Sequence, residues 1–294
     1  EGGQITYTAT LTNPAQTPVN VTLSNGSVIT IKAGESTGSV VVDTPANDVY
    51  NNGSTVSTTI TGATGGNFEN LVPNTTPAVT TITDSIDTTT VTLTAGSTVT
   101  EGGQITYTAT LTNPAQTPVN VTLSNGSVIT IKAGESTGSV VVDTPANDVY
   151  VNGSTVSTTI TGATGGNFES LVPSTTPAVT TITDSIDTTT VTLTAPTEAN
   201  EGGQVTYTAT LSNKAGTDVT LKLDNGSSIT IKAGETVGTV TVPAPTDDVF
   251  IDKSTQTVKI TETTGGNFEK LEVAGNGATT TINDTIDKVD VVLT

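Results

Sequence analysis

Cysteine, histidine, methionine and tryptophan are all absent from the 294 residues of this chain. Without thiols or imidazoles, the chain has no disulfides, no cysteine nucleophile, no histidine base and no zinc or haem site of the usual kind. Serine and threonine are abundant, but the sequence offers no base of the usual kind to activate a hydroxyl as a nucleophile. We therefore expect a chain that is not an enzyme.

Positive charge and aromatic side chains are also scarce. The chain has nine lysines, no arginine and 28 acidic residues, which gives a net charge of -19. Nucleic acids are bound through lysine and arginine, so nucleic-acid binding is not expected, whereas an acidic chain attracts cations. With 33% hydrophobic and 3% aromatic residues, several thin cores of Val, Ile, Leu and Ala are predicted in place of one large core.

Long apolar runs are missing as well. No stretch approaches the ~18 apolar residues of a membrane span, and the sequence shows no signal peptide. It starts at Glu1 and reads as a segment excised from a longer protein. Since disulfides are absent, an extracellular protein of this kind would need another stabilising device, and a bound metal is the obvious candidate.

A repeat of 100 residues organises the sequence. EGGQITYTATLTNPAQTPVN begins at residues 1 and 101, and EGGQVTYTATLSNKAGTDVT begins at residue 201. The first two copies differ at three positions over 94 residues, namely Asn51/Val151, Asn70/Ser170 and Asn74/Ser174. A period this long exceeds that of solenoid units, so each repeat is predicted to be a self-contained domain.

Within each repeat, apolar and polar residues alternate with the period of a β-strand. In the first copy the alternating segments, separated by Gly, Pro and Asn turn signals, are 4–12, 19–23, 28–32, 39–43, 56–61, 79–83 and 90–94. About seven short strands per 100 residues, with no helical period, predict an all-β fold of tandem immunoglobulin-like β-sandwich domains. Seven crossings carry the chain out at the end opposite to its entry, so we expect the domains to stack end to end as a rod.

We place the domain junctions at the recurring Asp-Ser-Ile-Asp segment, since it leaves no room for a flexible Gly/Ser linker. The predicted domains are 1–87, 88–187 and 188–287, and residues 288–294 form the leading strand of a following repeat. With these boundaries the first domain lacks its leading strand. Its exposed sheet edge predicts head-to-tail self-association through strand addition, although the chain ends can equally reflect where the segment was cut.

The order of the strands brings four acidic residues of each copy to the same end of the domain. We predict that they bind Ca²⁺, because carboxylates without His or Cys ligands favour this hard cation. The predicted metal residues are Glu1, Asp48, Asp84, Asp87, Glu101, Asp148, Asp184, Asp187, Glu201, Asp248, Asp284 and Asp287. The Gly-Gly-Asn-Phe-Glu loop of the next repeat would add Asn267 and Glu269. The alternative is that these carboxylates are solvated turn residues and strand caps.

The repeat resembles the extender domains of giant bacterial biofilm adhesins secreted by type I systems, such as the large adhesion protein of pseudomonads. The segments that carry the resemblance are EGGQITYTATLTNPAQTPV, ITIKAGESTGSV, ITGATGGNFENL and TITDSIDTTTVTLTA. The Glu-Gly start, Gly34-Glu35 and Asp48-Val49-Tyr50 are more distantly similar to a Calx-β domain. The glycine-rich nonapeptide calcium repeats of such exported proteins are absent from this sequence.

This resemblance implies an extracellular stalk on the bacterial cell surface, in which Ca²⁺ rigidifies the junctions and holds an adhesive tip away from the cell. Its partners would be the neighbouring repeats of the same chain. The alternative is that the repeats themselves bind a ligand, such as a polysaccharide or a neighbouring adhesin. A binding module of that kind would show an exposed aromatic cluster.

Overall fold

The structure is a computed structural model that describes residues 1–293. This part of the chain contains 27 strands and no helix, so no helix in it could span a membrane. The seven strands of the first repeat are β1 (Gln4–Thr10), β2 (Val19–Leu23), β3 (Val28–Ile31), β4 (Thr37–Asp43), β5 (Ser54–Thr58), β6 (Ile60–Gly65) and β7 (Ala78–Ile82).

The second and third repeats have ten strands each. Those of the second are β8 (Thr88–Thr94), β9 (Thr98–Thr100), β10 (Gln104–Leu111), β11 (Val119–Leu123), β12 (Val128–Ile131), β13 (Thr137–Asp143), β14 (Ser154–Thr158), β15 (Ile160–Gly165), β16 (Ser170–Pro173) and β17 (Ala178–Thr183). Those of the third are β18 (Thr188–Thr194), β19 (Glu198–Asn200), β20 (Gln204–Leu211), β21 (Val219–Leu223), β22 (Ser228–Ile231), β23 (Val237–Pro243), β24 (Ser254–Val258), β25 (Ile260–Gly265), β26 (Lys270–Ala274) and β27 (Ala278–Asn283).

The chain forms two compact units, and the division runs through the second repeat. The first unit comprises residues 1–95, 106–141 and 157–178, and the second comprises 96–105, 142–156 and 179–294. Each unit therefore holds one outer repeat together with part of the second repeat. The tandem β-sandwich fold is the one predicted from the alternating sequence.

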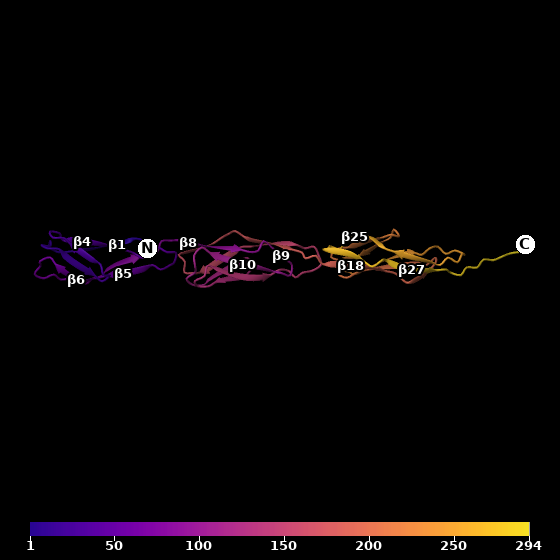
Figure 1. Cartoon of the computed structure of the whole chain (residues 1–294), viewed down its shortest axis with the longest axis horizontal. Coiled ribbons are helices and arrows are strands. Elements are labelled where there is room, and N and C mark those ends of the chain that lie inside the picture. The colour runs from indigo at the N-terminus through magenta and orange to yellow at the C-terminus, as the bar shows by residue number, and fades with distance from the viewer. Residues whose placement is uncertain (294) are drawn as a thin grey trace. The chain divides into compact units, whose positions relative to one another are not determined.

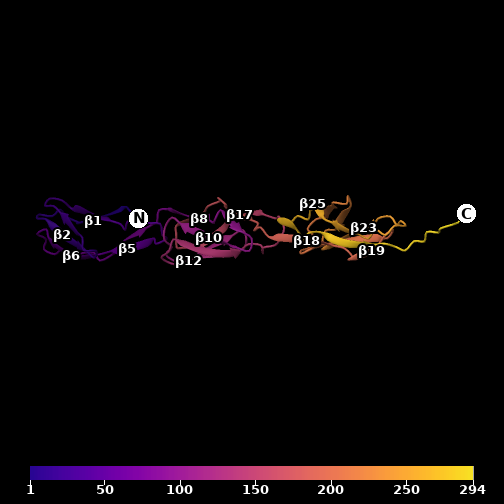
Figure 2. The same ribbon diagram turned by 45° about the vertical axis from the view of Figure 1, so that its right-hand side comes forward.

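Five sheets lie wholly or mainly in the first unit. Their strand orders are β1-β4, β3-β2-β6 and β5-β7 in the first repeat, and β13-β10-β8-β16 and β12-β11-β15 in the second. Strand β1 runs beside β4 (Figure 1), and β2 runs beside β6 (Figure 2). The sheets of the second unit have the orders β14-β17-β9, β23-β20-β18-β26, β22-β21-β25 and β19-β27-β24.

In the third repeat, the chain crosses the domain from one end to the other seven times, and we call each crossing a pass. Three of these passes are divided into two strands that belong to different sheets. The pairs β18/β19, β24/β25 and β26/β27 follow one another in sequence but belong to different sheets. Counting each pair as one pass reduces the ten strands to the seven passes predicted from the sequence. The short strand β19 was not predicted, because its three residues give little alternation to recognise. Strand β26 was not predicted either.

The prediction of one strand over 56–61 is wrong in detail, because the chain changes sheets at Thr59. Strand β5 ends at Thr58 and pairs with β7, whereas β6 begins at Ile60 and pairs with β2. The backbone of Thr59 bonds to Ser24 at the end of β2: its N–H donates to the hydroxyl (3.1 Å), and its carbonyl accepts from the Ser24 N–H (2.8 Å). These two bonds satisfy the Thr59 backbone where the ladder is interrupted.

Alternating side chains fill each core. In the third repeat, Tyr207, Leu221, Ile229, Ile231 and Ile282 are fully buried. The leading strand β18 supplies Val191, which is 0% exposed, and it lies between β20 and β26. The leading strand is therefore part of the core of the repeat that follows it.

Candidate metal centre

In the second and third repeats, a tight turn after the leading strand positions one glutamate. In the second unit, the N–H of Glu101 donates to the carbonyl of Thr183 at the end of β17 (3.0 Å). Gly102 follows with φ of 67°, which favours glycine, and its N–H donates to the carbonyl of Pro145 (2.7 Å). These bonds hold Glu101 between the end of β17 and the 145–148 loop. It is only 7% exposed.

Glu101 is one of three acidic side chains that meet in the second unit. Carboxylate oxygens of Glu101, Asp184 and Glu269 all lie within 4.8 Å of one another, and we call these residues the second carboxylate group. Both carboxylate oxygens of Glu101, with Oδ1 of Asp184 and Oε1 of Glu269, are buried without a hydrogen-bond partner among the described residues. Buried carboxylate oxygens without partners are costly, so the group needs a proton or a cation.

A related arrangement lies in the first unit, with Asp48, the counterpart of Asp148, in place of Asp84, the counterpart of Asp184. Carboxylate oxygens of Glu1, Asp48 and Glu169, the first carboxylate group, lie within 4.8 Å of one another. Among the described atoms, three carboxylate oxygens here are buried without a hydrogen-bond partner: Oε2 of Glu1, Oε1 of Glu169 and Oδ1 of Asp84, which is the counterpart of Asp184 in the first repeat. The same three kinds of residue are therefore left with unsatisfied oxygens in both units.

The third carboxylate group lies wholly within the third repeat. It consists of Glu201, Asp252 and Asp284, whose oxygens also lie within 4.8 Å of one another, and Oε2 of Glu201 is buried without a partner among the described residues. Asp252 stands where the other repeats have Asn52 and Asn152. Sequence reasoning missed it because the two nearly identical copies have an amide there.

The glutamate of the following repeat is brought in by its Gly-Gly-Asn-Phe-Glu turn. In the second unit, Gly266 has φ of 89°, which favours glycine. A Cβ atom at this position would lie 2.6 Å from the Phe268 ring, so the absence of a side chain leaves room for the ring. The N–H of Glu269 donates to the carbonyl of Val149 (3.0 Å), and the N–H of Val151 donates to the carbonyl of Asn267 (3.0 Å). Asn267 thus joins the two repeats through its backbone, and Glu269 points its carboxylate into the second group.

A stacked aromatic pair holds this turn in place in both units. The rings of Tyr150 and Phe268 are 5.9 Å apart with an interplanar angle of 19°, and Tyr50 and Phe168 are 5.6 Å apart at 23°. The Tyr150 hydroxyl also donates to the carbonyl of Lys214 (2.7 Å). This pairing was not predicted from the sequence, since the two rings come from segments more than 100 residues apart.

The remaining predicted residues lie around the groups in supporting positions. Asp148 accepts hydrogen bonds from the Tyr150 N–H (2.7 Å) and the Asn152 side chain (2.9 Å), and its charge acts on Glu101. Asp187 accepts from the Asn147 side chain (2.6 Å), and its N–H donates to Glu269 Oε2 (2.6 Å). Asp187 therefore lies outside the second carboxylate group and orients Glu269 through its backbone.

The same supporting positions recur in the other repeats. Asp87 accepts from the Asn47 side chain (2.6 Å), and its N–H donates to Glu169 (2.6 Å). Asp248 accepts from the Phe250 N–H (2.7 Å). Asp248 and Asp287 are exposed and lie outside the third group.

Burial and mutual repulsion raise the pKa of the two most buried glutamates. Burial acts first on the pKa of Glu101, followed by the negative charges of Asp184 and Asp148. Burial and then Asp252 raise the pKa of Glu201 from an ordinary 4.5 to about 7. In the absence of a cation, these carboxyls therefore hold protons more firmly than carboxyls on the surface do.

The raised pKa of Glu201 predicts how pH changes the stability of the cation-free chain. Between pH 4.5 and about 7 the folded chain binds more protons than the unfolded chain, so this contribution to stability is lost as pH rises. The variant Glu201→Gln has a neutral amide in place of the carboxyl group, so this position no longer titrates. In the presence of a chelator we expect it to melt at a higher temperature than the wild type at pH 7.5, with a smaller difference at pH 5.

Glu235→Gln, at an exposed carboxylate, is the matched control and should not reproduce this pattern. Thermal unfolding of the three proteins at both pH values measures the effect. A difference between Glu201→Gln and the wild type that does not change with pH would contradict the assignment.

The donor chemistry of the groups fits a hard divalent cation. Every side chain offers oxygen only, several of these oxygens have no other partner among the described atoms, and Ca²⁺ takes six to eight such ligands. In the second group, Glu101, Asp184 and Glu269 would hold the ion, and the negative charge of Asp148 would favour it. The ion would supply the positive charge that the buried carboxylates otherwise lack.

Comparison with known proteins finds a matching family and similar solved structures. The chain is similar to the crystal structure of a tetra-tandem repeat in the extending region of large adhesion protein, at 17% sequence identity and a TM-score of 0.31. The alignment covers 98% of this chain and 74% of that chain. No sequence among the curated proteins matches this chain. The LapA domain matches residues 1–85, 87–185 and 187–285, so this chain belongs to the LapA domain family.

Proposed function

We propose that this chain is an extender segment of a bacterial cell-surface adhesin, in which Ca²⁺ bound at the junctions between repeats stiffens a stalk that holds an adhesive tip away from the cell. Membership in the LapA domain family supports the adhesin role. The observation that carries the calcium role is that both junction groups combine carboxylates of two successive repeats, with buried oxygens that have no partner among the described residues.

Calcium at these groups would couple neighbouring repeats because the ligands come from both. Glu101 and Asp184 belong to the second repeat and Glu269 to the third. Without a cation, the mutual repulsion of their charges opposes close approach of the two repeats, whereas a divalent cation reverses the sign of that interaction. The aromatic pair Tyr150–Phe268 would keep the repeats in contact, and the ion would restrict their relative motion.

The spacer role is favoured over ligand binding by the positions of the aromatic residues. Of the five tyrosines and four phenylalanines, only Phe250 is largely exposed, at 72%. The others lie in the cores or in the stacked pairs at the junctions. A cluster of exposed aromatic side chains, typical of a polysaccharide-binding surface, is thus not found among the described residues.

Small-angle X-ray scattering with Ca²⁺ and with a chelator tests the proposal. Each predicted strand pass of 7–9 residues spans roughly 25–30 Å, so three repeats in line reach on the order of 100 Å. We expect that maximum dimension with Ca²⁺, and a broader distribution of shapes without it, while the far-ultraviolet circular dichroism stays unchanged. A scattering profile that does not respond to the ion would contradict the stiffening role.

A further inference from the structure

Two Asn-Gly dipeptides of the second repeat lie in different surroundings. Asn125-Gly126 lies in the hairpin turn between β11 and β12, and Asn152-Gly153 lies in the loop that leads into β14. An asparagine followed by glycine loses its side-chain amide more readily than other asparagines, because the glycine N–H is not shielded by a side chain when it attacks the side-chain carbonyl. The hydrogen bonds around each dipeptide then decide where the reaction takes place.

Hydrogen bonds hold the first dipeptide on both sides. The N–H of Gly126 donates to the carbonyl of Leu123 (3.0 Å), and Oδ1 of Asn125 accepts from the N–H of Ser127 (3.0 Å). Attack by the Gly126 nitrogen would break the first bond, and turning the amide toward that nitrogen would break the second. The turn therefore protects Asn125.

The second dipeptide has neither of these bonds. Among the described residues, no hydrogen bond involves the N–H of Gly153 or Oδ1 of Asn152, and both residues are exposed to water. Asn152 is held by its own N–H, which donates to Asp184 (3.2 Å), and by its Nδ2, which donates to Asp148 (2.9 Å). The attacking N–H and the attacked carbonyl are thus free, and the side chain lies beside the second carboxylate group.

The third repeat shows where a carboxylate at this position lies. Asp252 is the counterpart of Asn152, and its N–H donates to Asp284 (3.0 Å) as the Asn152 N–H donates to Asp184. A carboxylate oxygen of Asp252 lies within 4.8 Å of oxygens of Glu201 and Asp284. The same backbone attachment in the second repeat therefore brings a carboxylate at position 152 to the second carboxylate group.

We propose that Asn152 is a site of spontaneous deamidation, and that the reaction gives the second carboxylate group a fourth carboxylate. The nitrogen of Gly153 forms a bond to Cγ of Asn152, the Cγ–Nδ2 bond breaks, and ammonia leaves with the proton of the Gly153 N–H. Water then opens the cyclic imide. Cleavage between the nitrogen and Cγ gives aspartate, and cleavage at the backbone carbonyl gives isoaspartate, so either product carries one new negative charge.

The new charge strengthens cation binding at this group, a step that rests on the proposed calcium role. Asp148 loses the hydrogen bond from Nδ2 and repels the new carboxylate, which then turns toward Glu101 and Asp184. A unit negative charge about 5 Å from a divalent cation strengthens binding by about tenfold or more, even at the dielectric constant of water. Since water does not restore the amide, chains hold calcium here more tightly as they age.

Mass spectrometry of the whole chain, incubated with a chelator at mildly alkaline pH and then cleaved into peptides, tests the modification. We expect Asn152 to convert at least about tenfold faster than Asn125, the factor for two hydrogen bonds that must first break. Isoaspartate should be detected together with aspartate, because both form from the cyclic imide. Failure of Asn152 to convert, or conversion of Asn152 and Asn125 at equal rates, would overturn the proposal.

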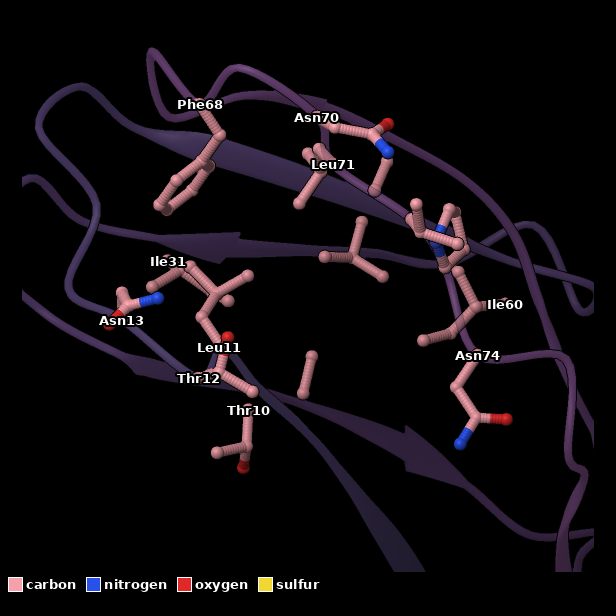
Figure 3. A pocket seen from close by; sticks show the side chains of 15 residues that line it. Thr10, Leu11, Thr12, Asn13, Ile31, Ile60, Phe68, Asn70, Leu71 and Asn74 are labelled. Atoms are coloured by element: carbon pink, nitrogen blue, oxygen red, sulfur yellow. The ribbon is translucent and has the colours of Figure 1, made fainter.

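Asparagines that are followed by larger residues provide internal references in the same sample. Asn13, Asn70 and Asn74 line a pocket of the first repeat, where Figure 3 shows their side chains. Proline follows Asn13 and has no N–H to attack with, and leucine and threonine, whose side chains hinder the attack, follow the other two. All three should keep their amides while Asn152 converts.

A calorimetric titration with Ca²⁺ tests the effect on the cation. Asn152→Asp reproduces the aspartate product and should bind Ca²⁺ about tenfold more tightly than freshly prepared wild type. The matched control, Asn125→Asp, adds the same charge in the hairpin turn and should leave the affinity unchanged. Equal affinities for the two variants would overturn the effect on the cation. Absence of binding in all three proteins would instead contradict the calcium role, and the mass spectra would still decide whether Asn152 deamidates.

Discussion

Glu101→Gln is expected to weaken Ca²⁺ binding at the second carboxylate group by about 100-fold or more. Substitutions outside the ligand shell of a metal already cost about 10–100-fold in affinity, and Glu101 is the most buried member of the group. Both of its carboxylate oxygens are buried without a hydrogen-bond partner among the described residues. Isothermal titration calorimetry of the wild type and the variant measures the loss.

The same substitution should have the opposite effect when no cation is present. Gln removes a buried charge that repels Asp184 and Asp148, so the cation-free variant should be at least as stable as the wild type. Glu101→Gln should therefore lose most of the stabilisation by Ca²⁺ without losing the fold. This separates a ligand from a residue that only supports the structure, because a structural defect would destabilise both forms.

Two further variants serve as references for Glu101→Gln. Glu135→Gln makes the same chemical change at an exposed position of the second repeat and should leave calcium affinity unchanged. Asp187→Asn should have a smaller effect than Glu101→Gln, because the Asp187 side chain bonds to Asn147 and only its backbone contacts Glu269. Equal losses for Glu101→Gln and Glu135→Gln would show that calcium binds through overall charge and not at this group.

Val91→Asp is expected to destabilise the second repeat by about 4 kcal/mol or more, the range seen when a charge replaces a buried apolar side chain. Val91 is 0% exposed, in a strand that lies between β10 and β16. A domain of this size is stable by roughly 5–15 kcal/mol, so the variant should bring the second repeat close to unfolding.

Native-state hydrogen exchange read by mass spectrometry locates this effect. Peptides from 105–111 should lose protection, whereas peptides from 19–31 in the first repeat should keep it. Thr92→Asp is the control, because Thr92 is exposed on the same strand. Loss of protection in the first repeat and not in the second would show that residues 88–94 belong to the preceding domain.

The sequence was sufficient to predict the repeat and its strands because both depend on local patterns. Alternation in 19–23 and 104–111 reflects side chains that point in turn to the core and to solvent, and β2 and β10 lie there. The changes of sheet, as at Thr59, could not be predicted. They depend on Ser24, which is 35 residues away in the sequence and becomes a partner only after folding.

The candidate site could be predicted in part, because the order of the strands follows from the alternating segments. Glu101 and Asp184 follow directly from the order of the strands, which brings the ends of β9 and β17 together. The structure adds that the backbone N–H of Asp187 donates a hydrogen bond to Glu269, and that Asp252 belongs to the third carboxylate group. These roles depend on side-chain directions in irregular loops, which alternation does not encode.

The most direct test of the calcium hypothesis is a calorimetric titration of the wild-type chain, freed of divalent cations, with Ca²⁺ at pH 7.5. If the carboxylate groups between the repeats are metal sites, the chain takes up at least two Ca²⁺ ions per molecule below millimolar concentration, one for each group that joins two repeats. Absence of uptake at millimolar Ca²⁺ would contradict the account and would leave these carboxylates as turn residues and strand caps.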